Sequence, residues 1–84
     1  MNMKKIEIID NIKNILATQL KHNNFEMNDE LSAKDVDGWD SLTHMIIITE
    51  IESRFGIRFK LKELNKLNNL GNLIGLVNLK LEEK

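Results

Sequence analysis

Residues 37–55 read DGWDSLTHMIIITEIESRF: a turn, a hydroxyl group and then a long apolar run. At about 100° per residue, a helix over 41–55 has two apolar faces. One face gathers His44, Ile47, Ile48, Ile51 and Phe55, and the opposite face gathers Leu42, Met45, Ile46 and Thr49. A domain of 84 residues can bury only one of them. We therefore expect the first face to enter the core and the second to meet a partner.

Ser41 opens this helix, and Asp40 stands immediately before it. The unpaired N–H groups and the positive end of the dipole at a helix start favour a bound or attached anion. A serine that follows Asp at a helix start is also an ordinary feature of N-caps, so the position alone leaves both interpretations open. Gly56 follows Phe55 directly and is the residue type that ends a helix in the left-handed conformation.

Three more helical segments are expected, which makes the fold class all-α: a four-helix bundle with a short third helix. The first helix is predicted over about residues 3–22 from apolar side chains at helical spacing, namely Ile8, Ile12, Ile15, Leu16 and Leu20. After Gly56, Ile57 and Phe59 turn inward, and residues 61–67 form one or two helical turns. Asn69 has the residue type of an N-cap for a last helix that carries Leu70, Leu73, Ile74, Val77 and Leu81.

A long loop from Asn23 to Asp40 separates the first two helices and shows no periodicity. Such a loop in a compact domain is expected to be functional or anchored. Its apolar side chains can each bury area worth roughly 1.5–3 kcal/mol; they are Phe25, Leu31, Val36 and Trp39. We predict an ordered loop in which Trp39 is a packing anchor. His22, just before the loop, is predicted to be solvated and to bind no ligand.

The core is predicted to include Ile12, Leu16, Ile47, Ile51, Phe55, Leu70 and Ile74. Gly71 and Gly75 lie inside the last helix, where two glycines cost about 2 kcal/mol relative to alanine. We interpret them as weak turns on the polar side of the helix. The alternative is that they allow close helix approach or access to an inner pocket.

The length predicts one domain over residues 1–84. The composition indicates in which cellular compartment such a domain can fold. The chain has no cysteine, which excludes disulfides and thiolate metal sites and suits a reducing compartment. No apolar run reaches the ~18 residues of a membrane helix, so we expect a soluble, cytoplasmic protein.

The net charge of -1 is unevenly distributed. Residues 26–52 hold eight acids against Lys34 alone, and residues 54–66 hold five bases against Glu63. The near-neutral total argues against nucleic-acid binding. The acidic segment suits a basic partner surface or simply keeps a small protein soluble.

Catalytic machinery is not evident in the sequence. Ser41 and His44 are three residues apart, but a nucleophile needs a base within hydrogen-bond reach and a group that orients the base, and neither can be assigned. There is no glycine-rich phosphate loop and no His/Asp/Glu set with metal spacing. We predict that the protein is not an enzyme and holds no metal.

Asp40-Ser41-Leu42, which opens an apolar helix ending in ESRFGI (52–57), resembles the start of the second helix in acyl and peptidyl carrier proteins. The resemblance covers nearly the whole chain, including the amphipathic first helix, the long loop and the last helix that opens at Asn69-Leu70. It implies that Ser41 receives a 4'-phosphopantetheine arm from coenzyme A and that Asp40 supports the transfer. The alternative role for Asp40 is to cap the helix. It also implies that the arm holds acyl or aminoacyl groups as thioesters.

The resemblance further implies partners: a phosphopantetheinyl transferase, an acyl- or aminoacyl-activating ligase and acyl-processing enzymes of a biosynthetic pathway. The expected docking residues are Leu42, Met45, Ile46, Thr49, Glu50 and Glu52. Thr43 and Ile46 stand where the fatty-acid carriers commonly have acids, and Trp39 stands where many carriers have an aliphatic residue. We therefore expect partners that depend less on salt bridges and a pathway other than primary fatty-acid synthesis.

Two other functions remain open: an unmodified carrier-like adaptor, or a homodimeric interaction module that uses the same apolar face. We expect a monomer. In the carrier family the space between the helices can admit a tethered acyl chain. Here the bulky side chains are predicted to leave little room; they are Ile47, Ile51, Phe59, Leu67 and Leu73.

Overall fold

The computed structural model of the protein describes residues 4–83, and all of the regular structure in that range is helical. The order is α1 (Lys5–Leu20), a short 3₁₀ turn η1 (Ala33–Asp35), α2 (Ser41–Phe55), α3 (Leu61–Leu64) and α4 (Leu70–Glu83). The predicted all-α fold with a long loop before the second helix and a short third helix is confirmed.

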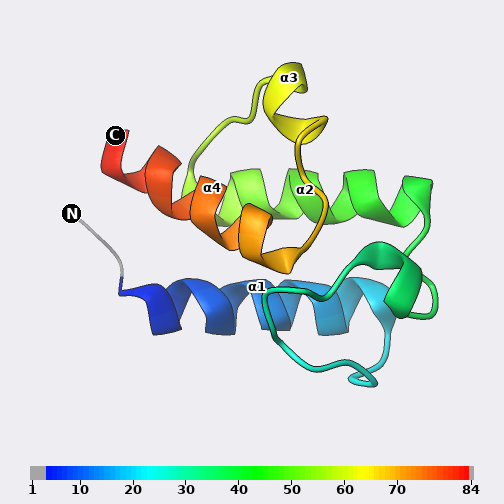
Figure 1. The fold of residues 1–84 in the computed structure, drawn as a ribbon. Coiled ribbons are helices and arrows are strands. Elements are labelled where there is room, and N and C mark those ends of the chain that lie inside the picture. The colour runs from blue at the N-terminus through cyan, green and yellow to red at the C-terminus, as the bar shows by residue number, and fades with distance from the viewer. Residues whose placement is uncertain (1–3, 84) are drawn as a thin grey trace.

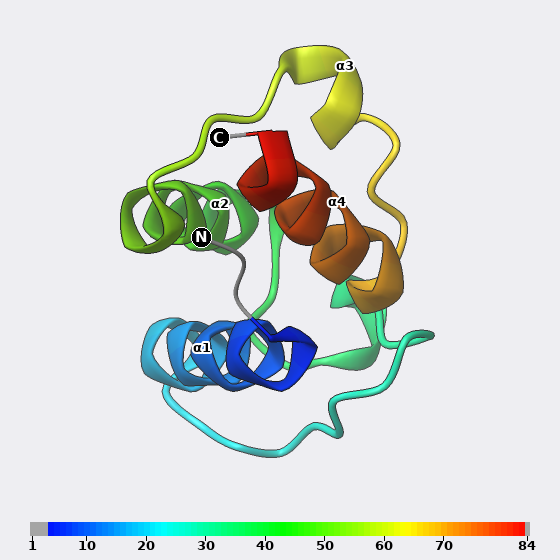
Figure 2. The same ribbon diagram turned by 90° about the vertical axis from the view of Figure 1, so that its left-hand side faces the viewer.

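Three long helices surround the core, and α3 lies outside them. In Figure 1, α1 and α2 run in opposite directions and α4 crosses obliquely beside them, while Figure 2 views α1 and α2 end-on. α1 packs against both α2 and α4. In Figure 2 the short α3 lies above α4, and the segment that connects α2 to α3 passes over α2. The loop from 21 to 40 returns along α1 and brings the chain to the start of α2.

The core consists of the residues that the helical spacing predicted. All seven predicted core residues are between 0% and 5% exposed. On α2, the buried side chains are Ile47, Ile48, Ile51 and Phe55, whereas Leu42, Met45 and Ile46 are 73%, 50% and 43% exposed. The predicted division of this helix into a buried and an exposed face is confirmed, with His44 half-buried between them.

Local backbone contacts set the ends of the helices, and α1 and α3 end earlier than predicted from the sequence. α1 ends at Leu20 rather than at 22, because Lys21 takes a left-handed conformation (φ 65°) and its N–H donates to the Ala17 carbonyl at 2.9 Å. The predicted start at residue 3 lies outside the described residues. α2 ends as predicted, at Gly56 with φ 65°. α3 is shorter than the predicted 61–67 and ends at Leu64.

The N-terminus of α4 is capped and tied to the long loop. Asn69 accepts a hydrogen bond from the Asn72 N–H at 2.9 Å through its side-chain oxygen, which confirms it as the N-cap. The Leu70 N–H donates to the Leu31 carbonyl at 2.7 Å. Two N–H groups that a helix start leaves unpaired therefore find partners.

The two glycines of α4 have different surroundings. The Gly71 N–H donates to the Asp29 carbonyl at 3.0 Å, and a Cβ on Gly71 would lie 2.9 Å from the Asp29 Cβ. Gly71 is therefore required by a close approach of the loop, and its interpretation as a merely weak turn is wrong. A Cβ on Gly75 would meet nothing within 4 Å.

The loop is anchored as predicted, with Leu31, Val36 and Trp39 buried and Phe25 partly buried against the core. Apolar anchors at this spacing hold an irregular segment in one conformation.

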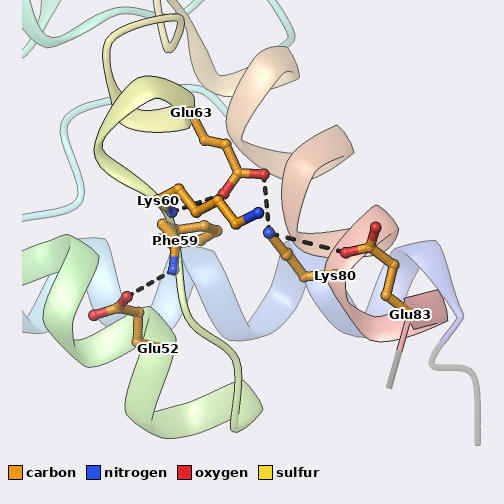
Figure 3. Close-up of polar contacts among 6 residues, drawn as sticks. All are labelled: Glu52, Phe59, Lys60, Glu63, Lys80 and Glu83. Atoms are coloured by element: carbon orange, nitrogen blue, oxygen red, sulfur yellow. Dashed lines mark hydrogen bonds and ion pairs between the residues drawn. The ribbon is translucent and has the colours of Figure 1, made fainter.

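Side-chain contacts hold the single turn of α3 (Figure 3). One carboxylate oxygen of Glu63 accepts the Lys60 N–H at 2.7 Å, and the other pairs with the Lys80 ammonium at 2.9 Å. Lys80 also lies 3.8 Å from Glu83. A helix this short is marginal by itself; the Glu63–Lys80 ion pair ties it to α4, and Leu64 packs against the core.

Candidate functional site

The segment that leads into α2 is held by His22, which lies two residues after the end of α1. The His22 Nδ1 accepts the Asn24 N–H at 3.0 Å, so its Nε2 carries the proton and donates to the Asp37 carbonyl at 2.7 Å. The prediction that His22 is only a solvated residue is therefore wrong. Gly38 follows with φ 84°, a left-handed conformation that glycine adopts without strain. Together these residues turn the chain toward the helix start.

The side chains of Trp39 and His44 contact each other at the start of α2. The Trp39 indole N–H donates to the His44 Nδ1 at 3.1 Å, and the two rings stack with centroids 6.1 Å apart. Burial lowers the pKa of His44 below its ordinary value. The ring is therefore neutral at neutral pH, with its proton on Nε2. Trp39 is 8% exposed, which confirms it as a packing anchor.

Asp40 caps α2 and leaves Ser41 open to solvent. The Asp40 carboxylate accepts the Thr43 N–H at 2.9 Å, and this hydrogen bond lowers the pKa of Asp40 below its ordinary value. Ser41 is exposed, and its hydroxyl makes no hydrogen bond to any described residue. Because Asp40 provides the cap, the Ser41 hydroxyl is available for another role.

The exposed face of α2 forms a shallow hollow beside Ser41. Five of the six predicted docking residues line it, namely Leu42, Met45, Ile46, Thr49 and Glu50. The sixth, Glu52, lies apart from the hollow and accepts the Phe59 N–H at 2.8 Å (Figure 3). Glu52 therefore helps to hold the segment that leads to α3. This contact had no signal in the sequence pattern.

A small cavity opens on the other side of the helix start. Its volume is about 70 Å³, and its lining comes from residues 31–33, 67–70 and Leu73, together with Trp39 and His44. It is small, as the bulky side chains predicted. Ile47 and Ile51 are fully buried and take no part in its lining, whereas Leu67 and Leu73 do. Sequence spacing did not point to this cavity because its walls come from separate segments.

This arrangement presents a hydroxyl group without activating it. The nearby His44 has its Nδ1 engaged by Trp39 and its Nε2 protonated, so it offers no basic nitrogen to Ser41. An outside enzyme would have to supply the base. A small helical domain with a capped, exposed serine at the start of a half-exposed apolar helix has the architecture of a carrier domain.

Comparison with known proteins agrees with this architecture. The family described as "Phosphopantetheine attachment site" matches residues 10–77. The solution structure of the holo acyl carrier protein from Geobacter metallireducens superposes with a TM-score of 0.84 at 38% sequence identity. That match covers 90% of this chain and 87% of the other. No curated protein matches the chain significantly.

The chain belongs to the phosphopantetheine-attachment family of acyl carrier proteins, whose members hold covalent phosphopantetheine and are not themselves catalytic. Within the part of the chain that the structure describes, no helix is both long and apolar enough to cross a membrane.

Proposed function

We propose that Ser41 is the attachment residue for phosphopantetheine, and that the protein carries acyl groups for a biosynthetic pathway other than primary fatty-acid synthesis. The observation that carries the proposal is the free, exposed hydroxyl of Ser41 directly after the Asp40 cap. The positive end of the α2 dipole favours a phosphodiester at this position.

The residues present fit this group. No described side chain blocks the Ser41 hydroxyl with a hydrogen bond, and the cap does not depend on it. In the transfer, the Ser41 oxygen bonds to the coenzyme A phosphorus that bears the pantetheine. The bond from that phosphorus to the adenosine 3',5'-bisphosphate portion breaks, and the serine proton passes to a base of the transferase. When bound, phosphopantetheine supplies a terminal thiol that holds an acyl group as a thioester.

Asp40 has a positioning role in this proposal. Its carboxylate remains ionised over a wide pH range because the Thr43 N–H lowers its pKa. By holding the first turn of α2, it sets the direction of the Ser41 side chain. The ionised group also lies where it can assist the magnesium ion that a transferase brings.

The hollow on α2 is the proposed docking surface for the transferase, an acyl- or aminoacyl-activating ligase and acyl-processing enzymes. Its apolar part is Leu42, Met45 and Ile46, and Glu50 is the one acid that lines it. Thr43 and Ile46 stand where more acidic carriers commonly have acids. This composition favours partners that bind through apolar contact more than through salt bridges, and it supports a pathway outside primary fatty-acid synthesis.

Intact mass tests the proposal. The apo protein is incubated with a broad-specificity phosphopantetheinyl transferase, coenzyme A and magnesium, and we expect the mass of one phosphopantetheine to be added. Ser41→Ala should abolish the gain, whereas Ser53→Ala, at another exposed serine of the same helix, should not. Because Asp40 is the cap, Ser41→Ala should keep its helical circular dichroism.

The alternatives give different results. If the wild-type protein keeps its apo mass with several active transferases, the attachment proposal fails and the adaptor function takes its place. A homodimeric module would sediment at twice the chain mass. Neither alternative accounts for an exposed serine in the Asp-Ser-Leu context of a phosphopantetheine family.

A further inference from the structure

The outer face of α2 does not end with the apolar hollow beside Ser41. A second hollow follows it toward the C-terminus of the helix, and Thr49 lines both of them. The second hollow is bounded by the end of α2 and by the segment after Gly56, with Arg58 in its lining. Figure 2 shows this segment passing over α2. The two hollows therefore form one surface that runs along α2 from Ser41 to Arg58.

Arg58 places a positive charge at the far end of this surface. Its side chain is exposed, and it makes no ion pair or hydrogen bond with any described residue. Glu52 lies in the same hollow, but its carboxylate accepts the Phe59 N–H at 2.8 Å and is directed at the backbone (Figure 3). Arg54, in contrast, donates to the Asn14 side-chain oxygen on α1 at 3.2 Å. The guanidinium of Arg58 is therefore open to a partner.

Most acids of the protein lie away from this end of α2. Of the eight acids in residues 26–52, only Glu50 and Glu52 are on α2, and the other six precede the helix. Most of the loop that carries those six lies beside α1, on the side of the molecule opposite α3 (Figures 1 and 2). Residues 54–66 hold five bases against Glu63, which already forms an ion pair with α4 at 2.9 Å. Exposed cations such as Arg58 and Lys62 therefore outnumber the acids near them.

The order of side chains along the surface defines what it fits. Met45 and Ile46 make it apolar near Ser41, and it becomes cationic beyond Gly56, ten residues after Ile46. At about 1.5 Å per residue, these two ends lie about 15 Å apart. A partner that covers both needs an apolar anchor and, about three helical turns away, a carboxylate. The planar arginine group suits a carboxylate because it offers two parallel N–H donors.

A helix of a partner protein fits these features better than a lipid surface does. A hollow accepts side chains that project from a helix, whereas clusters of about four to eight lysines or arginines are typical of lipid recognition. In Figure 3 the Lys60 side chain extends toward Glu63, and Lys66 lines a different hollow, between α3 and α4. Arg58 and Lys62 remain, which is fewer than such a cluster needs.

We infer that the outer face of α2 and Arg58 together recognise an acidic amphipathic helix of a partner enzyme. The apolar side chains of that helix occupy the hollow beside Ser41, and one of its carboxylates pairs with the Arg58 guanidinium. This inference rests on the proposed carrier function and specifies the chemistry of the partner. Arg58 is a specificity-determining residue in this role, because it repels a partner that has a basic group at the same place.

Two helical peptides test the inference on the full apo chain. Both carry the same leucine cluster at one end, and the other end, about three turns away, carries glutamates in one peptide and lysines in the other. The shifts of the Met45 and Gly56 amide resonances measure binding. We expect the glutamate peptide to bind about three- to tenfold more tightly at low salt, and this difference to shrink at about 0.15 M salt. Equal affinities at low salt would overturn the inference.

Reversing the charge of Arg58 provides the matched comparison. Arg58→Glu should make the lysine peptide the tighter ligand, whereas Lys13→Glu, which makes the same change in charge at an exposed position of α1, should keep the preference for glutamate. Arg58→Lys retains the charge without the two parallel donors, so it should keep a weaker preference for glutamate. If Arg58→Glu gave the same preference as Lys13→Glu, the inference would be wrong.

Two further measurements distinguish other occupants of the surface. Phosphatidylglycerol vesicles that shifted the Gly56 resonance more than the glutamate peptide does would indicate a lipid surface and overturn the inference. Sedimentation above the chain mass that Arg58→Glu abolished would indicate a second copy of the chain and also overturn it. The peptide titrations use the apo chain, and the mass gain with coenzyme A tests attachment at Ser41 separately. Failure of one proposal is therefore distinguishable from failure of the other.

Discussion

The two faces of α2 are built from similar residues and have different roles. Ile46 and Ile47 are adjacent and chemically identical, yet their side chains are 43% and 0% exposed. A step of about 100° around the helix axis separates them, and only one direction faces α1 and α4. Burial is therefore set by angular position and not by residue type. The same helix stabilises the fold on one side and offers an apolar surface to partners on the other.

The largest effect that tests this contrast should come from the inner face. Ile51 is completely buried, so Ile51→Ala removes packed methyl groups and leaves a cavity. We expect a loss of roughly 2–5 kcal/mol in the free energy of unfolding, measured by denaturant titration. If the variant were as stable as the wild type, the assignment of the inner face would be wrong.

The glycines of α4 extend the same contrast to a second helix. Gly71→Ala should destabilise the protein by about 1–3 kcal/mol, because its Cβ would lie 3.1 Å from the fixed Asp29 carbonyl oxygen. Gly75→Ala should stabilise it by about 0.5–1 kcal/mol, because the new methyl group meets open space and alanine favours the helix. Thermal unfolding of both variants measures these two stability changes, which should have opposite signs. A stabilising Gly71→Ala would show that the loop can move away from α4.

A smaller effect on stability is expected at the outer face, with a larger effect on function. Met45→Ala and Ile46→Ala should each change the free energy of unfolding by less than about 1 kcal/mol. Each should also slow modification by the transferase, because a docking contact is lost. The initial rate of mass gain measures the second effect. If both variants were modified at the wild-type rate, Met45 and Ile46 would not be docking contacts for the transferase.

Most of the fold and the helix start at Ser41 could be predicted because their signals are local. Apolar residues at helical spacing identified the core, and Asp40, Gly56 and Asn69 carried the capping signals at the positions where helices begin or end. α1 ends early, at Leu20, and the Lys21 that follows carries no such signal, since a lysine with positive φ cannot be recognised from its type.

The features that were missed depend on residues brought together by the fold. His22 and Asp37 are 15 positions apart, and Gly71 meets Asp29 across 42 positions. The cavity needs three separate segments for its walls. The Trp39–His44 bond was closer to being predictable, because a buried indole N–H usually requires an acceptor and His44 lay on the inner face of α2.

The smallest expected effect concerns pH and the half-buried His44, at the boundary between the two faces. Burial lowers the pKa of His44 in the folded protein below the value of about 6.5 that it has when unfolded. Between these two values the unfolded chain binds more protons than the folded chain, so stability falls as the pH is lowered below about 6.5 and levels off below the folded pKa. Protonation of Nδ1 would also remove the acceptor of the Trp39 indole N–H. Denaturant unfolding from pH 5 to pH 8, compared with His44→Gln, isolates this contribution, because the variant keeps every other titrating group. The wild type should lose more stability than the variant on acidification, and parallel curves would show that His44 is solvated as freely in the folded protein as in the unfolded chain.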